Sequence, residues 1–330
     1  MQVQLFYNQT NMYLVIVKIL LKIDFLANFN MNLILFKKNT FWTSLVLIIL
    51  NFNSCVSFEN SELDNLNDDK VLKIGHAGSG FSSWIPFNPY PANSFTSLQK
   101  AIVENKADGV EVDVHMTADG KFILYHDNKL ESKTNLSGCI SELKYNDIVK
   151  ANYQLGAPFD WFQSEKIIGL DSLILFLKQQ KQFPYLHLDI RHYSVCLNQE
   201  ENYQRSTKMI KSLIGYLKSF GIPTNKVVLI SLSHEVITKA KELKCPYELS
   251  LEETANFEEG LEWVKKMQLP YLTIKPGILS AEQSSSAHKA GIKIITFGAK
   301  SKSGNKRLLE VNPDVIQSNN LEALNSLLLE

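Results

Sequence analysis

From Val71 to the C-terminus, short apolar segments alternate with longer amphipathic ones, and this alternation leaves few folds open. Eight short runs rich in β-branched and apolar residues predict strands at 71–75, 109–114, 185–190, 226–231, 246–250, 271–275, 292–296 and 314–317. Segments of helical period lie between these runs at 94–105, 170–181, 204–220, 257–268 and 281–290. Because helices that separate strands imply parallel pairing through right-handed crossovers, we expect a parallel sheet.

The number of repeats favours one α/β fold, a closed (β/α)8 TIM barrel over residues 71–330. An open doubly wound sheet is the alternative, but no glycine-rich phosphate loop opens a helix after the first strand. Residues 117–169 do not fit the simple repeat. The Asp119-Gly120 turn followed by Phe122–Tyr125 predicts a small β-hairpin inserted after the second strand, at the barrel mouth.

Residues 1–55 differ from the rest in composition, and we predict an N-terminal export region there. Lys37 and Lys38 precede an apolar run at 41–50, whose length suits a signal peptide and is short for a membrane span. The run ends at Ser54-Cys55, which resembles a bacterial lipoprotein cleavage site in which Cys55 becomes lipidated. A conventional signal peptide that is cut nearby is the alternative.

The first thirty residues are apolar but interrupted by Lys18, Lys22 and Asp24, which a spanning helix tolerates poorly. We therefore expect Met31 to be the native start, with an N-terminal membrane helix as the alternative. Residues 56–70 are polar and acidic, which predicts a flexible tether. Together these features predict an exported protein, periplasmic or at the cell surface, held at the membrane by a lipid anchor or signal region.

The charge balance argues against nucleic acid as a partner. The chain carries 34 basic and 34 acidic residues, and without the four lysines and one aspartate of residues 1–55 the remainder has 30 and 33. No long basic run follows residue 40 to neutralise phosphates. Small molecules or lipids are the expected partners.

Carboxylate and imidazole side chains gather on two predicted strands, near the ends where barrel enzymes place their catalytic groups. At a spacing of two residues, side chains on one strand share a face. The residues with this spacing are Glu111, Asp113 and His115 on the second strand and His187, Asp189 and Arg191 on the third. Because unpaired buried carboxylates are unfavourable, we expect Glu111, Asp113 and Asp189 to bind a divalent cation, Mg²⁺ or Ca²⁺ rather than zinc.

Two further histidines stand where strands end. His76 follows the first strand, and His126 with Asp127 closes the predicted hairpin. Imidazoles beside a metal that polarises a phosphoryl oxygen can serve as general acid and general base. Taken singly, each polar residue can be explained as a solvated edge or a surface histidine, but their placement together at one barrel mouth indicates a site.

The segment DGVEVDVHMTADGKFILYHD, residues 108–127, resembles the central motif of the glycerophosphodiester phosphodiesterase family of phospholipase-C-like barrels. The resemblance extends from His76-Ala77-Gly78 through 91–102 and 169–177 to 186–191. It implies that Glu111, Asp113 and Asp189 are metal ligands and that His76 and His126 are the acid and base pair. Which histidine takes which role stays open.

This sequence departs from the family pattern at several positions. Ala77 stands where the family has Arg, and Ala92 stands where it has Glu. Asp189 replaces a glutamate, Arg191 a lysine, and Phe297 an aromatic residue that is usually tryptophan. Because Ala77 removes a cation, Arg191 and Lys275 are the candidate phosphate contacts. His115 is a further candidate substrate contact, which we expect to line the site or orient a ligand.

The resemblance implies hydrolysis of lipid-derived glycerophosphodiesters to glycerol phosphate and an alcohol. A lipid-headgroup phospholipase, C-like or sphingomyelinase-D-like, is one alternative, and a surface lipoprotein that binds without turnover is another. The aromatic loop 78–90 lies beside His76 and either recognises the substrate or forms a surface lid. Cys139, Cys196 and Cys245 are odd in number. The sequence leaves open whether any two of them pair, and buried free thiols are the expected state.

Overall fold

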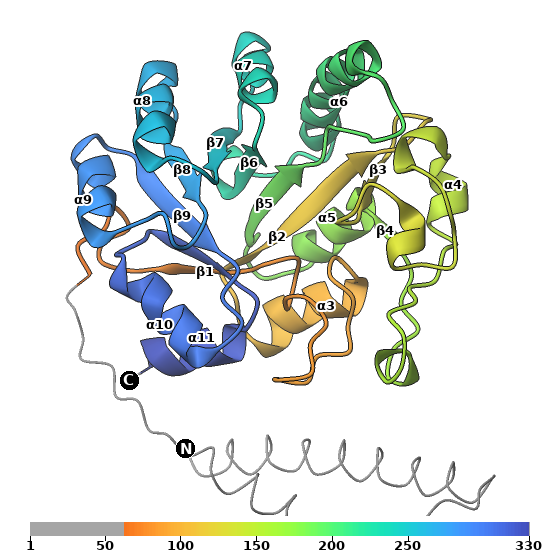
Figure 1. The fold of residues 1–330 in the computed structure, drawn as a ribbon, viewed down its shortest axis with the longest axis horizontal. Helices are drawn as coiled ribbons and strands as arrows, with labels where there is room; N and C mark the ends of the chain where they lie inside the picture. Colours follow the sequence, from red (N-terminus) through yellow and green to blue (C-terminus); the bar gives the residue numbers. More distant parts are fainter. Residues whose placement is uncertain (1–62, 330) are drawn as a thin grey trace, which may run out of the picture. The chain divides into compact units, whose positions relative to one another are not determined.

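Eight parallel strands close into a barrel in the computed structural model, which describes residues 63–329 (Figure 1). The strands are β1 (Leu72–Gly75), β2 (Gly109–Met116), β5 (Tyr185–Ile190), β6 (Val227–Ser231), β7 (Glu248–Glu253), β8 (Tyr271–Ile274), β9 (Lys293–Phe297) and β10 (Val315–Ser318). They follow one another around the sheet, and β1 pairs with both β10 and β2 to close it. The prediction of a (β/α)8 barrel is confirmed.

Helices surround the strands, as Figure 1 shows for most of the ring. They are α3 (Phe95–Gln99) with the π-helix η1 (Lys100–Glu104), α5 (Leu170–Lys178), α6 (Gln199–Ser219), α7 (His234–Glu242), α8 (Phe257–Met267), α9 (Ala281–Lys289), α10 (Lys302–Glu310) and α11 (Leu321–Leu328). Their starts follow from capping residues. Asn198 and Glu201 form a capping box at α6, and Ser280 and Gln283 form one at α9.

The two faces of each strand have different surroundings. On β2, Val110, Val112 and Val114 pack in the main core between strands and helices. The pairing register places Glu111 opposite His187 and Asp113 opposite Asp189, so these side chains share the inner face. The apolar residues Ile74, Val228, Ile230, Ile295 and Val315 form a separate inner cluster.

The insertion after β2 is larger than a hairpin. Strand β3 (Phe122–Leu124) pairs antiparallel with β2, as predicted, and an additional strand, β4 (Ile168–Gly169), pairs with β3. Short helices fill the remainder: η2 (Leu130–Ser132), η3 (Ile140–Glu142), α4 (Tyr145–Ile148) and η4 (Phe159–Trp161). The insertion has a small core of its own that includes Tyr125, Leu130, Ile140 and Ile148.

The last residues of the expected tether belong to the barrel. Asn65 is buried and donates to the carbonyl oxygen of Pro313 at 3.0 Å, and the Leu66 amide donates to Asp314 Oδ1 at 2.7 Å. Leu63 packs beside Leu308 and Ile316. The flexible tether is therefore corrected for residues 63–70, because their polar groups pair with the barrel. Residues 1–62, with the predicted export region and Cys55, lie outside the described residues.

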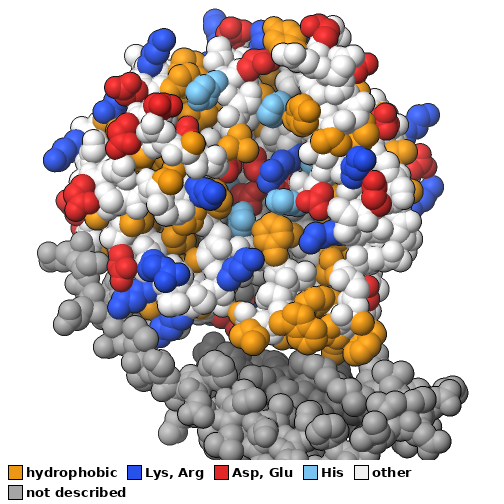
Figure 2. Space-filling model, in the orientation of Figure 1, with side chains coloured by type: hydrophobic (Ala, Val, Ile, Leu, Met, Phe, Trp, Pro, Cys, Tyr) orange, Lys and Arg blue, Asp and Glu red, His pale blue; other side chains and the backbone are white. Residues whose placement is uncertain are grey.

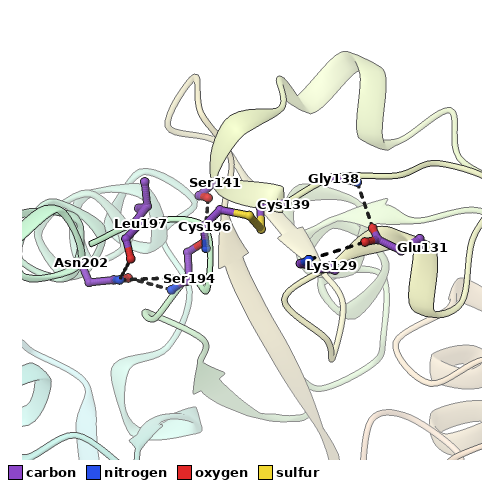
Figure 3. Close-up of a disulfide and its surroundings, with 9 residues drawn as sticks. All are labelled: Lys129, Glu131, Gly138, Cys139, Ser141, Ser194, Cys196, Leu197 and Asn202. Carbon is purple, nitrogen blue, oxygen red and sulfur yellow. Dashed lines mark hydrogen bonds and ion pairs between the residues drawn. A yellow bond between two sulfur atoms is a disulfide. The ribbon is translucent and has the colours of Figure 1, made fainter. Parts of the chain in front are cut away.

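Two cysteines form a disulfide, which corrects the expectation of free thiols. Cys139 and Cys196 are bonded, with their Cα atoms 6.3 Å apart, although 57 positions separate them in the sequence (Figure 3). The insertion places η3 against the loop after β5, where Ser141 and Ser194 also share a hydrogen bond of 2.8 Å. Cys245 has a free thiol. Within residues 63–329, no helix has the length and apolar character needed to cross a membrane.

Candidate active site

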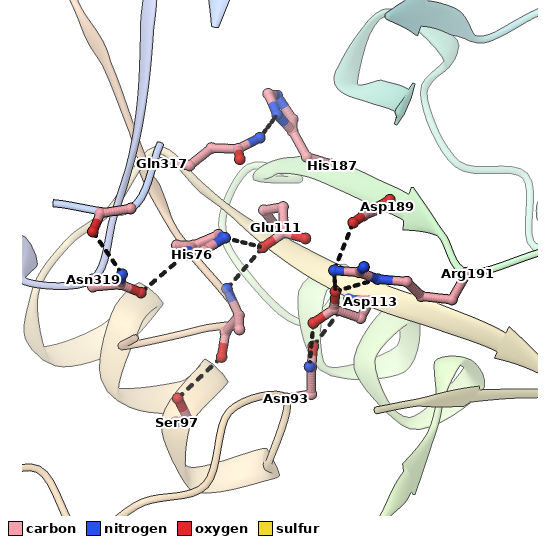
Figure 4. Close-up of polar contacts among 12 residues, drawn as sticks. His76, Asn93, Ser97, Glu111, Asp113, His187, Asp189, Arg191, Gln317 and Asn319 are labelled. Carbon is pink, nitrogen blue, oxygen red and sulfur yellow. Dashed lines mark hydrogen bonds and ion pairs between the residues drawn. The ribbon is translucent and has the colours of Figure 1, made fainter. Parts of the chain in front are cut away.

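Three carboxylates meet inside the barrel near the C-terminal ends of β2 and β5 (Figure 4). Glu111, Asp113 and Asp189 are 3%, 2% and 8% exposed. One oxygen of each lies within 4.8 Å of the others, which is close enough to share a cation. The structure thus brings together the three residues that were predicted as metal ligands.

The charges of this cluster are incompletely balanced by its neighbours. Burial, together with the nearby Asp113 and Asp189 carboxylates, raises the pKa of Glu111 well above its ordinary value. The Ala77 amide donates to Glu111 Oε2 at 2.8 Å. Burial also raises the pKa of Asp189 to about 6. A set of buried oxygen donors, two of them with raised pKa values, fits a hard divalent cation, which would stabilise the ionised forms.

Arg191 supplies a positive charge directly at the carboxylates. Its Nε donates to Asp113 Oδ1 at 2.8 Å, and its terminal nitrogen contacts the same oxygen and lies 2.9 Å from Asp189 Oδ2. Burial acts to raise the pKa of Asp113, but Arg191 and its other partners outweigh this, and the pKa is lowered. The residue predicted as a phosphate contact therefore also holds two of the predicted metal ligands.

Asn93 fixes the orientation of Asp113 and was not foreseen from the sequence. Its side-chain Nδ2 donates to Asp113 Oδ2 at 2.7 Å, and its side-chain Oδ1 accepts from the Asp113 backbone amide at 3.0 Å. Asn93 has a φ of 64°, in the left-handed region that asparagine tolerates better than most residues. Its position directly after Pro91-Ala92 was the only available signal.

His76 is held by a second unforeseen asparagine. His76 Nδ1 lies 2.9 Å from Asn319 Oδ1, and Asn319 donates its amide to the Gly298 carbonyl oxygen at 2.9 Å. Because that donation assigns the Asn319 oxygen to the histidine, Nδ1 carries a hydrogen. The other ring nitrogen, Nε2, faces Glu111 Oε2 at 3.8 Å (Figure 4). Burial lowers the pKa of His76.

His126 has a charged partner instead. Its Nδ1 lies 2.6 Å from Asp127 Oδ1, and this hydrogen bond raises the pKa of His126. Phe81 lies between the two histidines, with ring centroids 5.5 Å from His76 and 5.2 Å from His126. The Phe297 ring also contacts His76, with the ring centroids 5.8 Å apart. Aromatic rings thus flank the histidines that were predicted as acid and base.

Two further residues were predicted as substrate or phosphate contacts, His115 and Lys275, and their surroundings differ from those of Arg191. His115 is only 2% exposed, and burial lowers its pKa to about 3, so the ring is neutral. It hydrogen-bonds to the backbone of His126, which suits a supporting role better than contact with a phosphate. Lys275 follows β8 and is exposed. His187 is buried and pairs with Gln317 at 3.0 Å.

Glu252 is a fourth carboxylate that the sequence analysis missed. It lies on β7, which β6 separates from β5 in the sheet. Burial, and to a lesser extent the negative charge of Asp189, raises the pKa of Glu252 to about 7. The predicted strand ended at residue 250, whereas β7 continues to Glu253. The acidic pair Glu252-Glu253, one residue after the end of the predicted strand, was the signal available.

Acidic and histidine side chains, red and pale blue in Figure 2, meet in a hollow near the centre of the face shown.

The model of the glycerophosphoryl diester phosphodiesterase family matches residues 85–323. This range includes the three carboxylates and His126.

Curated relatives show partial similarity. The chain is 25% identical over 146 residues to the uncharacterised protein YqiK of Bacillus subtilis, which is 44% of this chain and 54% of that protein. It is 36% identical over 85 residues to a glycerophosphodiester phosphodiesterase of the same species, 26% of each chain. The chain therefore spans about half or less of these two relatives. A glycerophosphodiester phosphodiesterase of Caldanaerobacter subterraneus is 23% identical over 77% of this chain and 96% of its own.

Solved structures agree on the fold. A glycerophosphoryl diester phosphodiesterase structure from Silicibacter pomeroyi has a TM-score of 0.66 at 15% identity, covering 78% of this chain and 93% of that one. A phosphodiesterase from Oleispira antarctica, in complex with the product sn-glycerol-3-phosphate, has a TM-score of 0.65 at 20% identity, covering 78% and 96%. With the family match over most of the barrel, these findings show that the chain belongs to the glycerophosphoryl diester phosphodiesterase family.

Proposed function

We propose that this protein is a metal-dependent phosphodiesterase that hydrolyses lipid-derived glycerophosphodiesters to glycerol phosphate and an alcohol. The observation that carries the proposal is the pair of histidines on either side of Phe81, beside a buried cluster of three carboxylates. Family membership and the product in the Oleispira antarctica structure support the substrate class.

Glu111, Asp113 and Asp189 are the proposed ligands of the cation, Mg²⁺ or Ca²⁺. When bound, such an ion polarises a phosphoryl oxygen and neutralises charge that develops there. The fit rests on the all-oxygen donor set, its burial and the raised pKa values of Glu111 and Asp189. Arg191 already compensates part of the negative charge and is the proposed cation for the phosphate in the absence of an arginine at Ala77.

The hydrogen-bond partners suggest how the histidines divide the proton transfers. His76 is half-buried and paired with the neutral amide of Asn319, which favours a neutral ring with a lone pair at Nε2. It is the proposed general base that accepts a proton from the attacking water. His126 is paired with the Asp127 carboxylate, which favours the protonated ring. It is the proposed general acid that gives its proton to the leaving alcohol oxygen as the phosphorus–oxygen bond breaks.

The disulfide supports the proposed location. Structural disulfides persist in oxidising compartments and are rare in the reducing cytosol. Cys139 and Cys196 join two loops that follow β3 and β5. We therefore propose export to the periplasm or cell surface, with Cys55 as the site of a lipid anchor.

Hydrolysis of glycerophosphocholine by the purified full-length chain tests the proposal. Turnover is expected with Mg²⁺ or Ca²⁺, with glycerol phosphate as the product, and is expected to stop with a chelator. The variant His126→Ala should lower turnover about 10²- to 10⁴-fold while thermal unfolding and metal binding remain unchanged. An inactive wild-type chain with every cation would favour a binding protein, and a phosphorylated headgroup or cyclic phosphate would indicate a different cleavage.

A further inference from the structure

Two loops beside the barrel mouth present a cluster of large apolar side chains. Trp84, Ile85 and Phe87 come from the loop between β1 and α3, and Phe159 and Phe162 come from the insertion; we call these five residues the aromatic rim. Trp84 and Phe159 have ring centroids 5.6 Å apart, and Phe87 lies 6.1 Å from Phe159 and 5.2 Å from Phe162. The rim is therefore one cluster built from segments about seventy positions apart.

The tip of the rim projects into solvent. Trp84 is 61% exposed and Ile85 is 86% exposed. Figure 2 shows a group of orange side chains at the lower right of the face that contains the central hollow. Apolar side chains that gather on a surface in this way mark an interaction site more often than isolated ones do.

Polar groups of Ser83 and Asn88 in the first loop are paired within that loop. Ser83 and Asn88 exchange two backbone hydrogen bonds of 3.0 and 2.9 Å, and Ser83 Oγ donates to the Pro86 carbonyl oxygen at 2.6 Å. The buried amide of Asn88 lies 3.2 Å from the Phe81 carbonyl oxygen. These contacts hold residues 84–87 as a closed turn whose exposed side chains are apolar.

The second loop behaves in the same way. Residues 155–164 of the insertion contain one charged residue, Asp160, which accepts from the backbone amides of Leu155 at 2.9 Å and Gly156 at 2.8 Å, and from Gln163 Nε2 at 2.8 Å. The first loop, residues 78–90, contains no charged residue at all. The two loops thus present no uncompensated charge at the rim, and the polar groups of Ser83, Asn88 and Asp160 are paired.

We propose that the aromatic rim docks onto a lipid bilayer and inserts Trp84 and Ile85 into its interfacial region. Paired polar groups and absent charge are what a medium without water requires, whereas most protein interfaces use polar and charged contacts around their apolar centre. Tryptophan suits the membrane interface because its ring is apolar and its N–H is polar. Projecting side chains fit a deformable lipid surface better than a pocket for one acyl chain.

The position of the rim gives docking a consequence for catalysis. Phe81 belongs to the same loop as Trp84 and contacts both His76 and His126. A bilayer at the rim therefore lies next to the mouth and supplies diesters that still carry an acyl chain. This consequence rests on the proposed function, whereas docking itself does not.

Tryptophan quenching by brominated lipid tests docking on the full-length chain. The chain has four tryptophans: Trp42, Trp84, Trp161 and Trp263. The protein is added to phosphatidylcholine vesicles with and without brominated acyl chains. In wild type, part of the tryptophan emission should shift to the blue on vesicles and be quenched by the brominated chains. The Trp84→Phe variant is expected to lack this part of the emission. Trp263→Phe is the matched control, because Trp263 stacks on His234 at 4.4 Å, outside the rim, and it should keep that part of the emission. Trp42 and Trp161 are common to all forms and cancel in the difference.

Two results would overturn the proposal. The first is equal quenching in wild type and Trp84→Phe. The second is a Trp84 emission that is already blue-shifted without vesicles, because another part of the chain or a second copy would then cover the rim; sedimentation separates these two cases. High salt should leave the quenching unchanged, since the rim carries no net charge.

Turnover on two substrates connects docking to the proposed function. Ile85→Ser should lower the rate on lysophosphatidylcholine carried in vesicles about tenfold, because the serine side chain loses the apolar surface that Ile85 buries in the bilayer. The rate on dissolved glycerophosphocholine should stay unchanged. Failure on both substrates in the wild type contradicts the proposed function and leaves the quenching result to decide docking. Equal loss on both substrates contradicts the link between rim and catalysis.

Discussion

Buried carboxylates at the two ends of the barrel differ in how many hydrogen-bond donors surround them. Asp314 stands just before β10, at the N-terminal end of the strands, and is fully buried. Its Oδ1 accepts from the Leu66 amide at 2.7 Å, and its Oδ2 accepts from the Ile294 amide at 2.7 Å and lies 2.9 Å from His288 Nε2. Both oxygens of this carboxylate are therefore satisfied by groups of the protein.

Glu111, at the mouth, is nearly as buried but less well compensated. It accepts one backbone hydrogen bond, from Ala77, and its Oε2 lies 3.8 Å from His76 Nε2. Burial and the neighbouring carboxylates raise its pKa well above the ordinary value. A buried carboxylate with enough protein donors thus serves the structure, whereas one that lacks them is available to an external cation.

The same chemical change should have opposite effects at the two ends. Asp314→Asn places an amide NH2 against backbone N–H groups or His288, and we expect a loss of about 3 kcal/mol in the free energy of unfolding. Glu111→Gln is the matched control, because it removes a charge that burial disfavours. It should leave metal-free stability equal or higher. Urea unfolding in a chelator measures both variants, and a large loss in Glu111→Gln would break the distinction.

Metal addition sharpens the comparison at the mouth. A divalent cation at 100 times its Kd should stabilise the wild type by about 2.7 kcal/mol, because it binds the folded chain. Thermal unfolding with and without Mg²⁺ or Ca²⁺ provides the measurement, and calorimetric titration gives Kd independently of activity. Asp314→Asn should keep the metal-induced increment, and Glu111→Gln should lose most of it. An unchanged transition temperature in the wild type would count against the cation site.

The fold and the acidic cluster were predictable because they depend on local periodicity. The segment Glu111-Val112-Asp113 alternates at the period of a strand, so the sequence alone places both carboxylates on one face. The barrel followed from the repeated alternation of strands and helices. Asp189 was predictable for the same reason, since β5 repeats the pattern and the register confirms that it lies opposite Asp113.

Features that depend on distant pairing were not predictable. Asn319 contacts His76 across 243 positions, and Asn93 contacts Asp113 across 20, but neither residue type signals a partner by itself. The disulfide between Cys139 and Cys196 depends on how the insertion folds against the loop after β5. The docking of residues 63–70 was missed because their polar composition is typical of linkers, whereas their partners lie near Asp314.

The two histidines differ in their hydrogen-bond partners, because Nδ1 of His126 pairs with a carboxylate and Nδ1 of His76 pairs with an amide oxygen. Asp127→Asn tests this difference, with a smaller expected effect than the variants above. The hydrogen bond to Asp127 raises the pKa of His126, so a protonated acid persists to higher pH and activity falls as pH rises through that pKa. Removal of the carboxylate should lower this pKa and move the alkaline limb of the pH–rate profile to lower pH. The acid limb should stay in place, because it reflects His76, whose pKa is lowered by burial and whose partner Asn319 is neutral. A profile that shifts only on its acid side would exchange the proposed roles of the two histidines.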